Sequence, residues 1–223
     1  MQKPLLIIDP NCPVAYDPYL LEKYTLGGVE ATVIRVAEKL GETLPVVVAQ
    51  HNRRRQTLTK NVTYAPLNSR TYFDKWHGVI VIRNIGFALN ILPLLVMKYV
   101  PIWVWNHDLQ TQLHYIHFKA ANALGVGSVY VSDFQRQQIL DFCAADQFEP
   151  NQKFIKRIYN PLDDGLLPDK TPVDSHKLLF ASSAHKGLQE TIEVFTALYA
   201  KDPRFHLVVT DPGYSTPKRV LFE

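Results

Sequence analysis

The stretch Tyr24-Thr-Leu-Gly-Gly-Val-Glu-Ala-Thr-Val-Ile-Arg-Val-Ala-Glu-Lys-Leu40 places a pair of glycines directly before an amphipathic segment. Its apolar side chains recur at helical spacing, which predicts a helix with one face packed on a core and a free amino end. Without side chains at Gly27 and Gly28, a ligand can approach the backbone closely, and the unpaired amides of the first turn point towards it. This arrangement suits a phosphate group, although such a pair can also serve only as a tight turn before a buried helix.

Length and composition bound the rest of the interpretation. The chain has 223 residues, of which 47% are hydrophobic and 20% charged, values typical of a globular protein with a sizeable core. The formal net charge is only +3, from 24 basic and 21 acidic residues, which argues against a nucleic-acid partner. The one basic run, Arg53-Arg54-Arg55, is interpreted as a solvated loop, with contact to lipid head groups or an anionic acceptor as the alternative.

The cysteines and the lack of long apolar runs indicate the cellular compartment in which the protein is expected. Cys12 and Cys143 lie far apart without metal-ligand spacing, and both are interpreted as small hydrophobic residues in a reducing environment. The apolar run Leu5–Ile8 is too short for a signal peptide. The longest apolar stretch, Phe87–Val96, is too short to span a bilayer. The sequence therefore predicts a cytoplasmic protein, with peripheral membrane contact at most.

Apolar runs typical of buried parallel strands alternate with helical patterns along most of the chain. The first run, Leu5–Ile8, is followed by a long loop that reaches the glycine pair. Further strands are predicted at residues 45–49, 62–66 (a short edge strand), 78–83, 101–105, 128–131 and 154–158, and further helices at 87–99, 111–124 and 133–144. This alternation predicts an α/β fold with a doubly wound, Rossmann-like parallel sheet.

A segment rich in proline and charge, residues 167–176, is interpreted as a linker that ends a first domain at residue 166. Residues 177–223 then begin a second Rossmann-like domain, with a strand at 177–181, a helix at 188–201 and a strand at 205–210. One βαβ unit cannot cover both faces of its own sheet. We therefore expect this second domain to be incomplete and to expose apolar surface, which favours self-association or a completing partner.

Polar clusters follow the predicted strands, at the sheet edge where ligands of such folds bind. Asp9, Asn106-His107-Asp108 and Ser132-Asp133 each come directly after a strand, although such residues can also cap helices. The segment Ser182–Leu188 is more specific, because Lys186 supplies a cation just before a glycine and a helix amino end. The phosphate-binding loop of nucleotide triphosphatases and the glycine fingerprint of dinucleotide-binding folds are both absent from the sequence. The sequence therefore predicts a diphosphate site of another kind.

Five segments stand in order along the chain: Leu26-Gly-Gly-Val-Glu30, Trp105-Asn-His-Asp108, Val131-Ser-Asp-Phe-Gln-Arg136, Ile158-Tyr-Asn-Pro-Leu-Asp163 and Leu178–Val194. In this order they resemble the motifs of family 4 glycosyltransferases of the GT-B fold, which pair two Rossmann-like domains around a cleft. The resemblance runs nearly end to end, and it implies a GT-B protein that is truncated within its nucleotide-sugar domain.

The resemblance implies an enzyme that transfers a sugar, with retention, from a nucleotide-sugar donor to a glycan or glycolipid acceptor in cell-surface polysaccharide biosynthesis. It implies no metal ligand cluster and no cofactor besides the donor substrate. His107 would contact the transferred sugar as the catalytic residue. The donor-binding residues that it implies are Gly27, Gly28, Ser183, Lys186 and Gly187, and the residues of the cleft on the acceptor side are Asn106, Asp108, Ser132 and Asn160.

Two departures from the family's pattern put catalysis in question. The arginine expected about five residues before Lys186 is missing, so either His185 substitutes for it or part of the phosphate clamp is absent. The family's paired glutamates, spaced by seven residues, are expected well beyond Glu223, where the sequence stops. Glu30 and Glu38 have a similar spacing but lie on the first helix, and we interpret them as a chance match.

Three other functions were weighed. A catalytically incomplete glycosyltransferase-like binding or partner subunit is the main alternative. An α/β-hydrolase is disfavoured because the Gly-x-Ser-x-Gly motif does not occur. A metal-dependent hydrolase is disfavoured because no carboxylate stands at useful spacing from its candidate ligands, which would be His51, His107, His114 and His117.

Overall fold

A computed structural model of the chain describes residues 2–24, 26–68, 71, 75–96, 99–162 and 170–210, while the side chains of Val96 and His185 lie outside its described part. The chain divides into two compact units, residues 1–21 with 28–162 and residues 22–27 with 163–223. Each unit is described by itself. Residues 167–169 of the predicted linker, and the predicted second domain after residue 210, lie outside the described residues.

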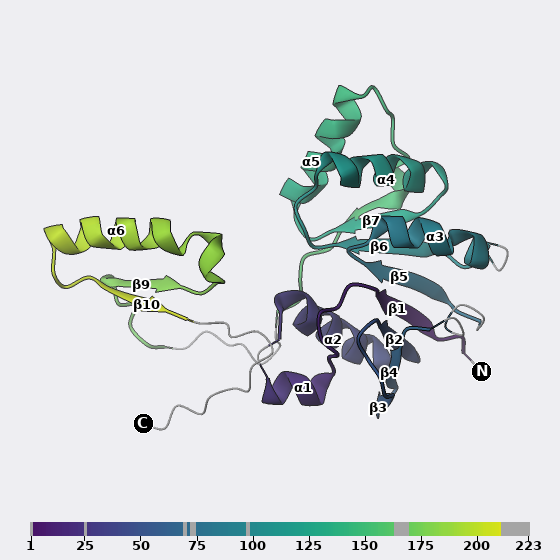
Figure 1. The fold of residues 1–223 in the computed structure, drawn as a ribbon, viewed down its shortest axis with the longest axis horizontal. Coiled ribbons are helices and arrows are strands. Elements are labelled where there is room, and N and C mark those ends of the chain that lie inside the picture. The colour runs from purple at the N-terminus through teal and green to yellow at the C-terminus, as the bar shows by residue number, and fades with distance from the viewer. Residues whose placement is uncertain are drawn as a thin grey trace. The chain divides into compact units, whose positions relative to one another are not determined.

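Within the described residues, the first unit is built on an eight-stranded sheet of order β3-β4-β2-β1-β5-β6-β7-β8 (Figure 1). Its neighbouring strands are parallel, apart from β3, which runs antiparallel to β4. The strands are β1 (Leu5–Asp9), β2 (Val46–Gln50), β3 (Thr57–Thr59), β4 (Val62–Pro66), β5 (Gly78–Ile82), β6 (Ile102–Asn106), β7 (Gly127–Tyr130) and β8 (Ile155–Arg157). The predicted doubly wound, Rossmann-like sheet is confirmed.

The central strand β1 is buried because its run of leucine and isoleucine meets apolar strands on both sides. Leu5 pairs with Val46 of β2 and with Gly78 of β5, and the parallel register continues from there. The side chains of Leu6–Ile8 are wholly buried. Since β2 lies on one side of β1 and β5 on the other, the direction of the strand order reverses between β1 and β5.

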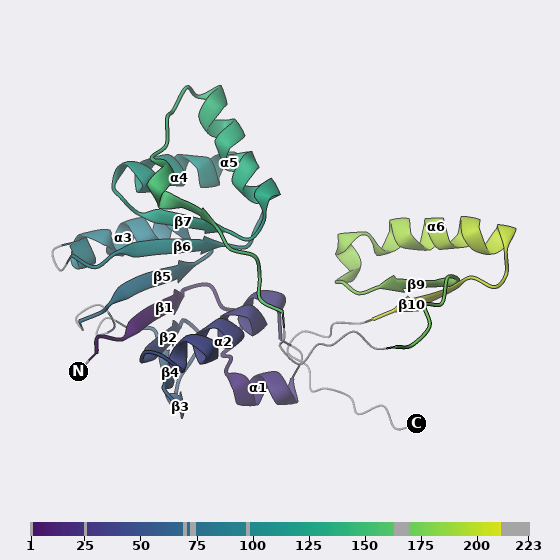
Figure 2. The same cartoon turned by 180° about the vertical axis from the view of Figure 1, so that it is seen from behind.

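Helices cover both faces of this sheet (Figure 1, Figure 2). On one face lies α2 (Gly28–Gly41), and on the other lie α3 (Ile85–Val96), α4 (Gln112–Ala123) and α5 (Asp133–Ala145). Right-handed crossovers that leave β1 in opposite directions place their helices on opposite faces, so the order of strands explains this division.

The hydrophobic core lies between the sheet and the α3, α4 and α5 layer. Val81 and Val104 contribute to it from central strands, and Phe118 and Ile139 from α4 and α5. Burial of such side chains is the main source of stability in a fold of this kind. Cys12 and Cys143 are both buried free thiols, as their interpretation as small hydrophobic residues predicted.

Two short elements lie where the sequence predicted loops. The helix α1 (Pro18–Lys23) falls inside the long loop expected before the glycine pair, and β3 follows the arginine run. At this end of the sheet the edge strand is therefore β3, which corrects the predicted edge position of residues 62–66. Elements of six and three residues are too short to show a periodicity in the sequence.

The arginine run is only partly solvated, which corrects its interpretation as a solvated loop. Arg53 is buried and forms an ion pair with Asp17, with Nη2 and Oδ2 2.6 Å apart. It also donates hydrogen bonds to the backbone oxygens of Tyr16, at 3.0 Å, and Arg55, at 2.8 Å. Arg54 and Arg55 are exposed. The buried pair ties the segment before α1 to the one between β2 and β3.

The second unit is a strand-helix-strand arrangement, as predicted. Its parallel strands β9 (Lys177–Phe180) and β10 (His206–Val209) are joined through the short 3-10 turn η3 (Ala184–Lys186) and the helix α6 (Leu188–Lys201). Within the described chain, no residue of α6 is fully buried. Leu179 and Val209 of the two strands are 60% and 48% exposed, so this unit by itself exposes apolar surface, as expected of a single βαβ unit.

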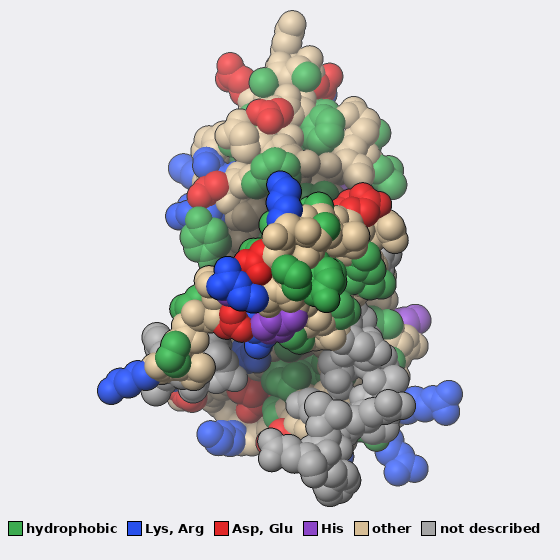
Figure 3. Space-filling model, turned by 90° about the vertical axis from the view of Figure 1, so that its left-hand side faces the viewer, with side chains coloured by type: hydrophobic (Ala, Val, Ile, Leu, Met, Phe, Trp, Pro, Cys, Tyr) green, Lys and Arg blue, Asp and Glu red, His purple; other side chains and the backbone are tan. Residues whose placement is uncertain are grey.

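Charged side chains of both signs are interspersed over the face drawn in Figure 3, together with hydrophobic ones. This mixture agrees with the small net charge of +3. Among the described residues, there is no helix with the length and apolar character needed to cross a bilayer.

Candidate functional site

The carboxyl ends of β1, β5 and β6 bring three chemically active side chains to one edge of the first unit's sheet. Asp9 is the last residue of β1, Arg83 directly follows β5, and His107 directly follows β6. The strand order reverses between β1 and β5, and in doubly wound folds such a reversal opens the crevice in which ligands bind. The fold therefore places a candidate site at the ends of these strands.

Asp9 is wholly buried and held by two hydrogen bonds. The hydroxyl of Tyr16 donates to Oδ2 at 3.1 Å, and the backbone N–H of Asn11 donates to Oδ1 at 3.3 Å. Burial raises the pKa of Asp9 above its usual value, while the Arg83 guanidinium nearby acts in the opposite direction. The carboxyl group is thus fixed in position next to a cation.

The first turn of α2 contributes an open glycine and a buried carboxylate. A Cβ atom placed on Gly28 would meet no described atom within 4 Å, so no described side chain fills the space next to this glycine. Glu30 is only 5% exposed, and its Oε1 lies 4.0 Å from Nη2 of Arg83. By contrast, Glu38 accepts a hydrogen bond from the Tyr64 hydroxyl at 2.9 Å, and the interpretation of its spacing from Glu30 as a chance match stays a prediction.

Arg83 adopts the left-handed backbone conformation, with a φ of 60°, which is uncommon for a large side chain. Its backbone N–H donates to the carbonyl of Trp105 at 2.9 Å and so joins the ends of β5 and β6. Its side chain is 21% exposed. Sequence reasoning missed Arg83, although a charged residue directly after an apolar strand was a usable signal.

The imidazole of His107 packs against the indole of Trp105, with ring centroids 4.8 Å apart. Among the described residues, neither Nε2 of His107 nor Nε1 of Trp105 has a hydrogen-bond partner, although both atoms are buried. Burial, together with the nearby Arg83, lowers the pKa of His107 to about 4. The ring is therefore neutral at physiological pH, so that it can donate or accept a hydrogen bond but does not act as a cation.

Two of the predicted cleft residues are used by the fold itself. Asn106 is buried, and its amide group donates to the carbonyls of Val104, at 3.4 Å, and Val129, at 3.3 Å. Ser132 caps α5, because its hydroxyl accepts the backbone N–H of Gln135 at 3.1 Å. These contacts explain both residues structurally, and a role in a cleft stays a prediction.

Asp108, which follows β6 just after His107, and Asn160 are both exposed. The backbone carbonyl of Asp108 accepts hydrogen bonds from the side-chain amides of Gln110, at 2.7 Å, and Gln135, at 3.0 Å. Asn160 lies in the segment that follows β8. Contact of either side chain with an acceptor also stays a prediction.

The other predicted donor-binding residues belong to the second unit. Ser183 is buried, whereas Lys186 is exposed at the end of η3. Gly187 begins the approach to α6 with a φ of 105°, a conformation that favours glycine. Gly27 is grouped with this unit and Gly28 with the first. An exposed lysine before a helix amino end has the chemistry of an anion site, and its use by a donor stays a prediction.

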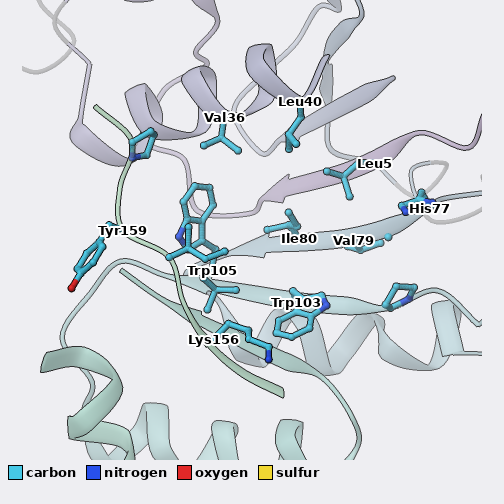
Figure 4. Close-up of a pocket in the computed structure, with 15 residues that line it drawn as sticks. Leu5, Val36, Leu40, His77, Val79, Ile80, Trp103, Trp105, Lys156 and Tyr159 are labelled. Atoms are coloured by element: carbon cyan, nitrogen blue, oxygen red, sulfur yellow. The ribbon is translucent and has the colours of Figure 1, made fainter. Parts of the chain in front are cut away.

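An apolar pocket of about 620 Å³ lies on the sheet face that α2 partly covers. Trp103 and Trp105 of β6 line it together with Val36 and Leu40 of α2 (Figure 4). Because Trp105 also packs on His107, the pocket adjoins the candidate site. No sequence pattern singled out this pocket, because its walls come from segments that are distant in the chain.

Metal ligation was an alternative role for the histidines. Within the described ranges, no three histidine, cysteine, aspartate or glutamate side chains are grouped as metal ligands. His114 instead forms a capping box with Thr111 at the start of α4. The structure thus gives this histidine a role at the start of a helix.

Comparisons with known proteins show the fold. No family model matches the sequence, and no curated protein sequence is detectably similar to it. Among solved structures, the chain is similar to HepE (Alr3699) of Anabaena, whose crystal structure is of a complex with UDP-glucose. The TM-score is 0.53 at 12% sequence identity, and the similarity covers 93% of this chain and 60% of the HepE chain. The chain thus spans 60% of the length of that protein, and this likeness shows an α/β, Rossmann-like architecture.

Proposed function

We propose that the protein is a glycosyltransferase that moves a sugar from a nucleotide-sugar donor to a glycan or glycolipid acceptor. The observation that carries the proposal is the open amino end of α2 at Gly28, at the sheet edge where Arg83 and His107 follow their strands. A nucleotide sugar needs backbone amides for its phosphates and hydrogen-bonding side chains for its sugar. HepE, which has a similar fold, was crystallised with UDP-glucose, and this supports the class of ligand.

In this proposal His107 contacts the transferred sugar as a neutral hydrogen-bonding group. Its Nε2 has no partner among the described residues, so a sugar hydroxyl would complete its bonding. Because the pKa of His107 is lowered to about 4, the ring is not poised to protonate the leaving group at neutral pH. Its contribution to rate is to hold the sugar as positive charge develops there.

The amides around Gly28, at the amino end of α2, would stabilise the departing diphosphate. For Gly27, Ser183, Lys186 and Gly187, which are grouped in the second unit, donor binding is proposed on the motif resemblance alone. An ammonium group and free helix amides bind phosphate oxygens strongly. We propose retention of configuration, since stabilising the leaving diphosphate on the donor face requires no nucleophile from the protein. We further assign the reaction to cell-surface polysaccharide biosynthesis, on the motif resemblance.

The test uses the open space at Gly28. Leucine favours helices, and its side chain would extend into space that no described atom occupies, so Gly28→Leu should leave the fold intact while it blocks a phosphate. We expect isothermal titration calorimetry to show UDP binding weakened by about 1.5 to 3 kcal/mol, the value of a charge-assisted contact.

Gly28→Ala is the matched control, because its single methyl group fills less of the same space. Its loss of affinity should be smaller than that of Gly28→Leu, and thermal unfolding of both variants should match that of the wild type. Wild-type affinity in Gly28→Leu would remove the phosphate site from this helix end. Binding of nucleotide sugars without any turnover would instead favour a binding or partner subunit.

A further inference from the structure

We propose that Glu30 and Arg83, which lie beside the buried Asp9, bind hydroxyl groups of the transferred sugar and form a subsite separate from the one for the donor's phosphates. This inference rests on the proposed function and deepens it, because it assigns the sugar to a named group of side chains. None of the three residues is among the site residues that the motif resemblance implies.

The charges of the cluster favour a neutral ligand. Of the three residues of the cluster, Arg83 is a cation, whereas Asp9 and Glu30 both carry carboxyl groups. His107 contributes no charge at neutral pH, because its pKa is about 4. The net charge is negative when both carboxyls are ionised and zero when Asp9 holds a proton. A diphosphate would therefore meet no excess of positive charge here, while a sugar requires none.

Glu30 and Arg83 keep hydrogen-bonding capacity that no described residue uses. Their closest approach is 4.0 Å, which is too long for a hydrogen bond. Within the described chain, neither side chain makes a hydrogen bond to another residue. A carboxylate only accepts and a guanidinium only donates. Neighbouring sugar hydroxyls do both, so this pair matches them.

Two further observations point to a ligand. Arg83 has a φ of 60°, and such conformations of bulky residues concentrate at functional sites. Next to it, Trp105 is only 5% exposed, yet its Nε1 has no partner among the described residues, and the same holds for Nε2 of His107. Buried polar atoms seldom stay unpaired, so a ligand rich in hydroxyl groups at this edge would supply the missing bonds.

The competing explanation is that Arg83 only neutralises two buried carboxyls. That role needs a positive charge but not the planar fork of the guanidinium, so Arg83→Lys separates the two explanations. Glu30→Gln is the second variant, because it keeps the size of the side chain and removes its charge. The charge-matched control is Glu38→Gln, on the same helix, where the carboxylate bonds to Tyr64 and Thr59.

Calorimetric titrations with UDP and with UDP-glucose measure the sugar's contribution as the ratio of the two affinities. In Arg83→Lys and in Glu30→Gln we expect this ratio to fall about tenfold, the effect of one charge-assisted hydrogen bond, while the affinity for UDP itself changes less than about twofold. Glu38→Gln should keep the wild-type ratio. Thermal unfolding recorded on the same samples verifies that each variant is folded.

The outcomes are distinct. If the wild type prefers UDP-glucose over UDP and both variants keep that preference, the subsite is overturned while the proposed function stands. If the two variants lose equal affinity for UDP and for UDP-glucose, the residues bind the phosphates and the sugar subsite is overturned. A wild type that binds both ligands equally would also overturn the subsite. If the wild type binds neither, the proposed function fails and the subsite falls with it.

Discussion

At the scale of single residues, the burial of His107 can be tested by a pH titration of its imidazole ring. Burial lowers the pKa of its imidazole to about 4, whereas a solvated histidine titrates near 6.5. We expect the imidazole NMR signals of His107, assigned by comparison with His107→Gln, to stay unshifted between about pH 8 and 5. A titration midpoint near 6.5 would show that water reaches the ring freely.

The same pKa affects stability. A folded-state pKa below the unfolded one means that the unfolded chain binds more protons between about pH 6.5 and 4, so this residue's contribution to stability falls as the pH drops through that window. The resulting loss of unfolding free energy is at most about 1.4 kcal/mol for each unit by which the two pKa values differ. Asp9, whose pKa is raised by burial, acts in the opposite direction. The unfolding free energy of His107→Gln should therefore fall less between pH 7 and 5 than that of the wild type, and equal losses would contradict this.

Arg53 carries the second prediction at this scale. In the wild type, Nη2 of Arg53 lies 2.6 Å from Oδ2 of the buried Asp17. Arg53→Ala would leave this carboxylate buried without its cationic partner. Breaking such a pair costs about 3 to 5 kcal/mol, which urea unfolding can measure. Arg54→Ala, at the exposed neighbour, should cost less than about 0.5 kcal/mol. Similar effects of the two changes would show that Arg53 is solvated, as its sequence context alone suggests.

At the scale of elements, the sequence predicted the order of the long strands and helices, because periodicity and apolar runs are local properties. It failed where structure depends on distant contacts. In the run of three arginines, nothing local distinguishes the first one, and its burial depends on Asp17, which lies 36 positions earlier. The strand β3 likewise exists because β4 offers it a pairing edge.

The pairing of β6 with β7 gives a prediction about packing. The register sets Gly127 opposite Trp103, and a Cβ atom on Gly127 would overlap the indole ring. Gly127→Ala should therefore displace Trp103 and destabilise the protein by about 1 to 3 kcal/mol, the usual cost of overpacking. Urea unfolding followed by tryptophan fluorescence measures both the cost and the changed environment of the ring.

Gly28→Ala serves as the control for this experiment, because no described atom would lie within 4 Å of its new methyl group. It should change stability by no more than about 1 kcal/mol. Equal destabilisation by the two substitutions would mean that the indole does not lie against Gly127.

At the scale of the whole molecule, the sequence predicted the same edge of the sheet that the fold favours for a candidate site, but it singled out only some of the side chains there. Asp9 and His107 could be found because each comes at the end of an apolar strand. Glu30 could not, since its burial beside Arg83 arises only when α2 packs on the sheet. Lys186 and Gly187 belong to the second unit, and their role with a donor is a proposal.

The central claim is that the reversal of strand order between β1 and β5 holds a nucleotide sugar. The most direct measurement is an NMR titration of the isotope-labelled chain with UDP-glucose. We predict saturable shifts of the backbone amides of Gly28, Arg83 and His107, and with UDP alone a shift of Gly28 without one of Arg83. Saturable shifts confined to other parts of the chain, or the absence of any shift at ligand concentrations of about 10 mM, above the millimolar range of weak specific binding, would contradict the claim.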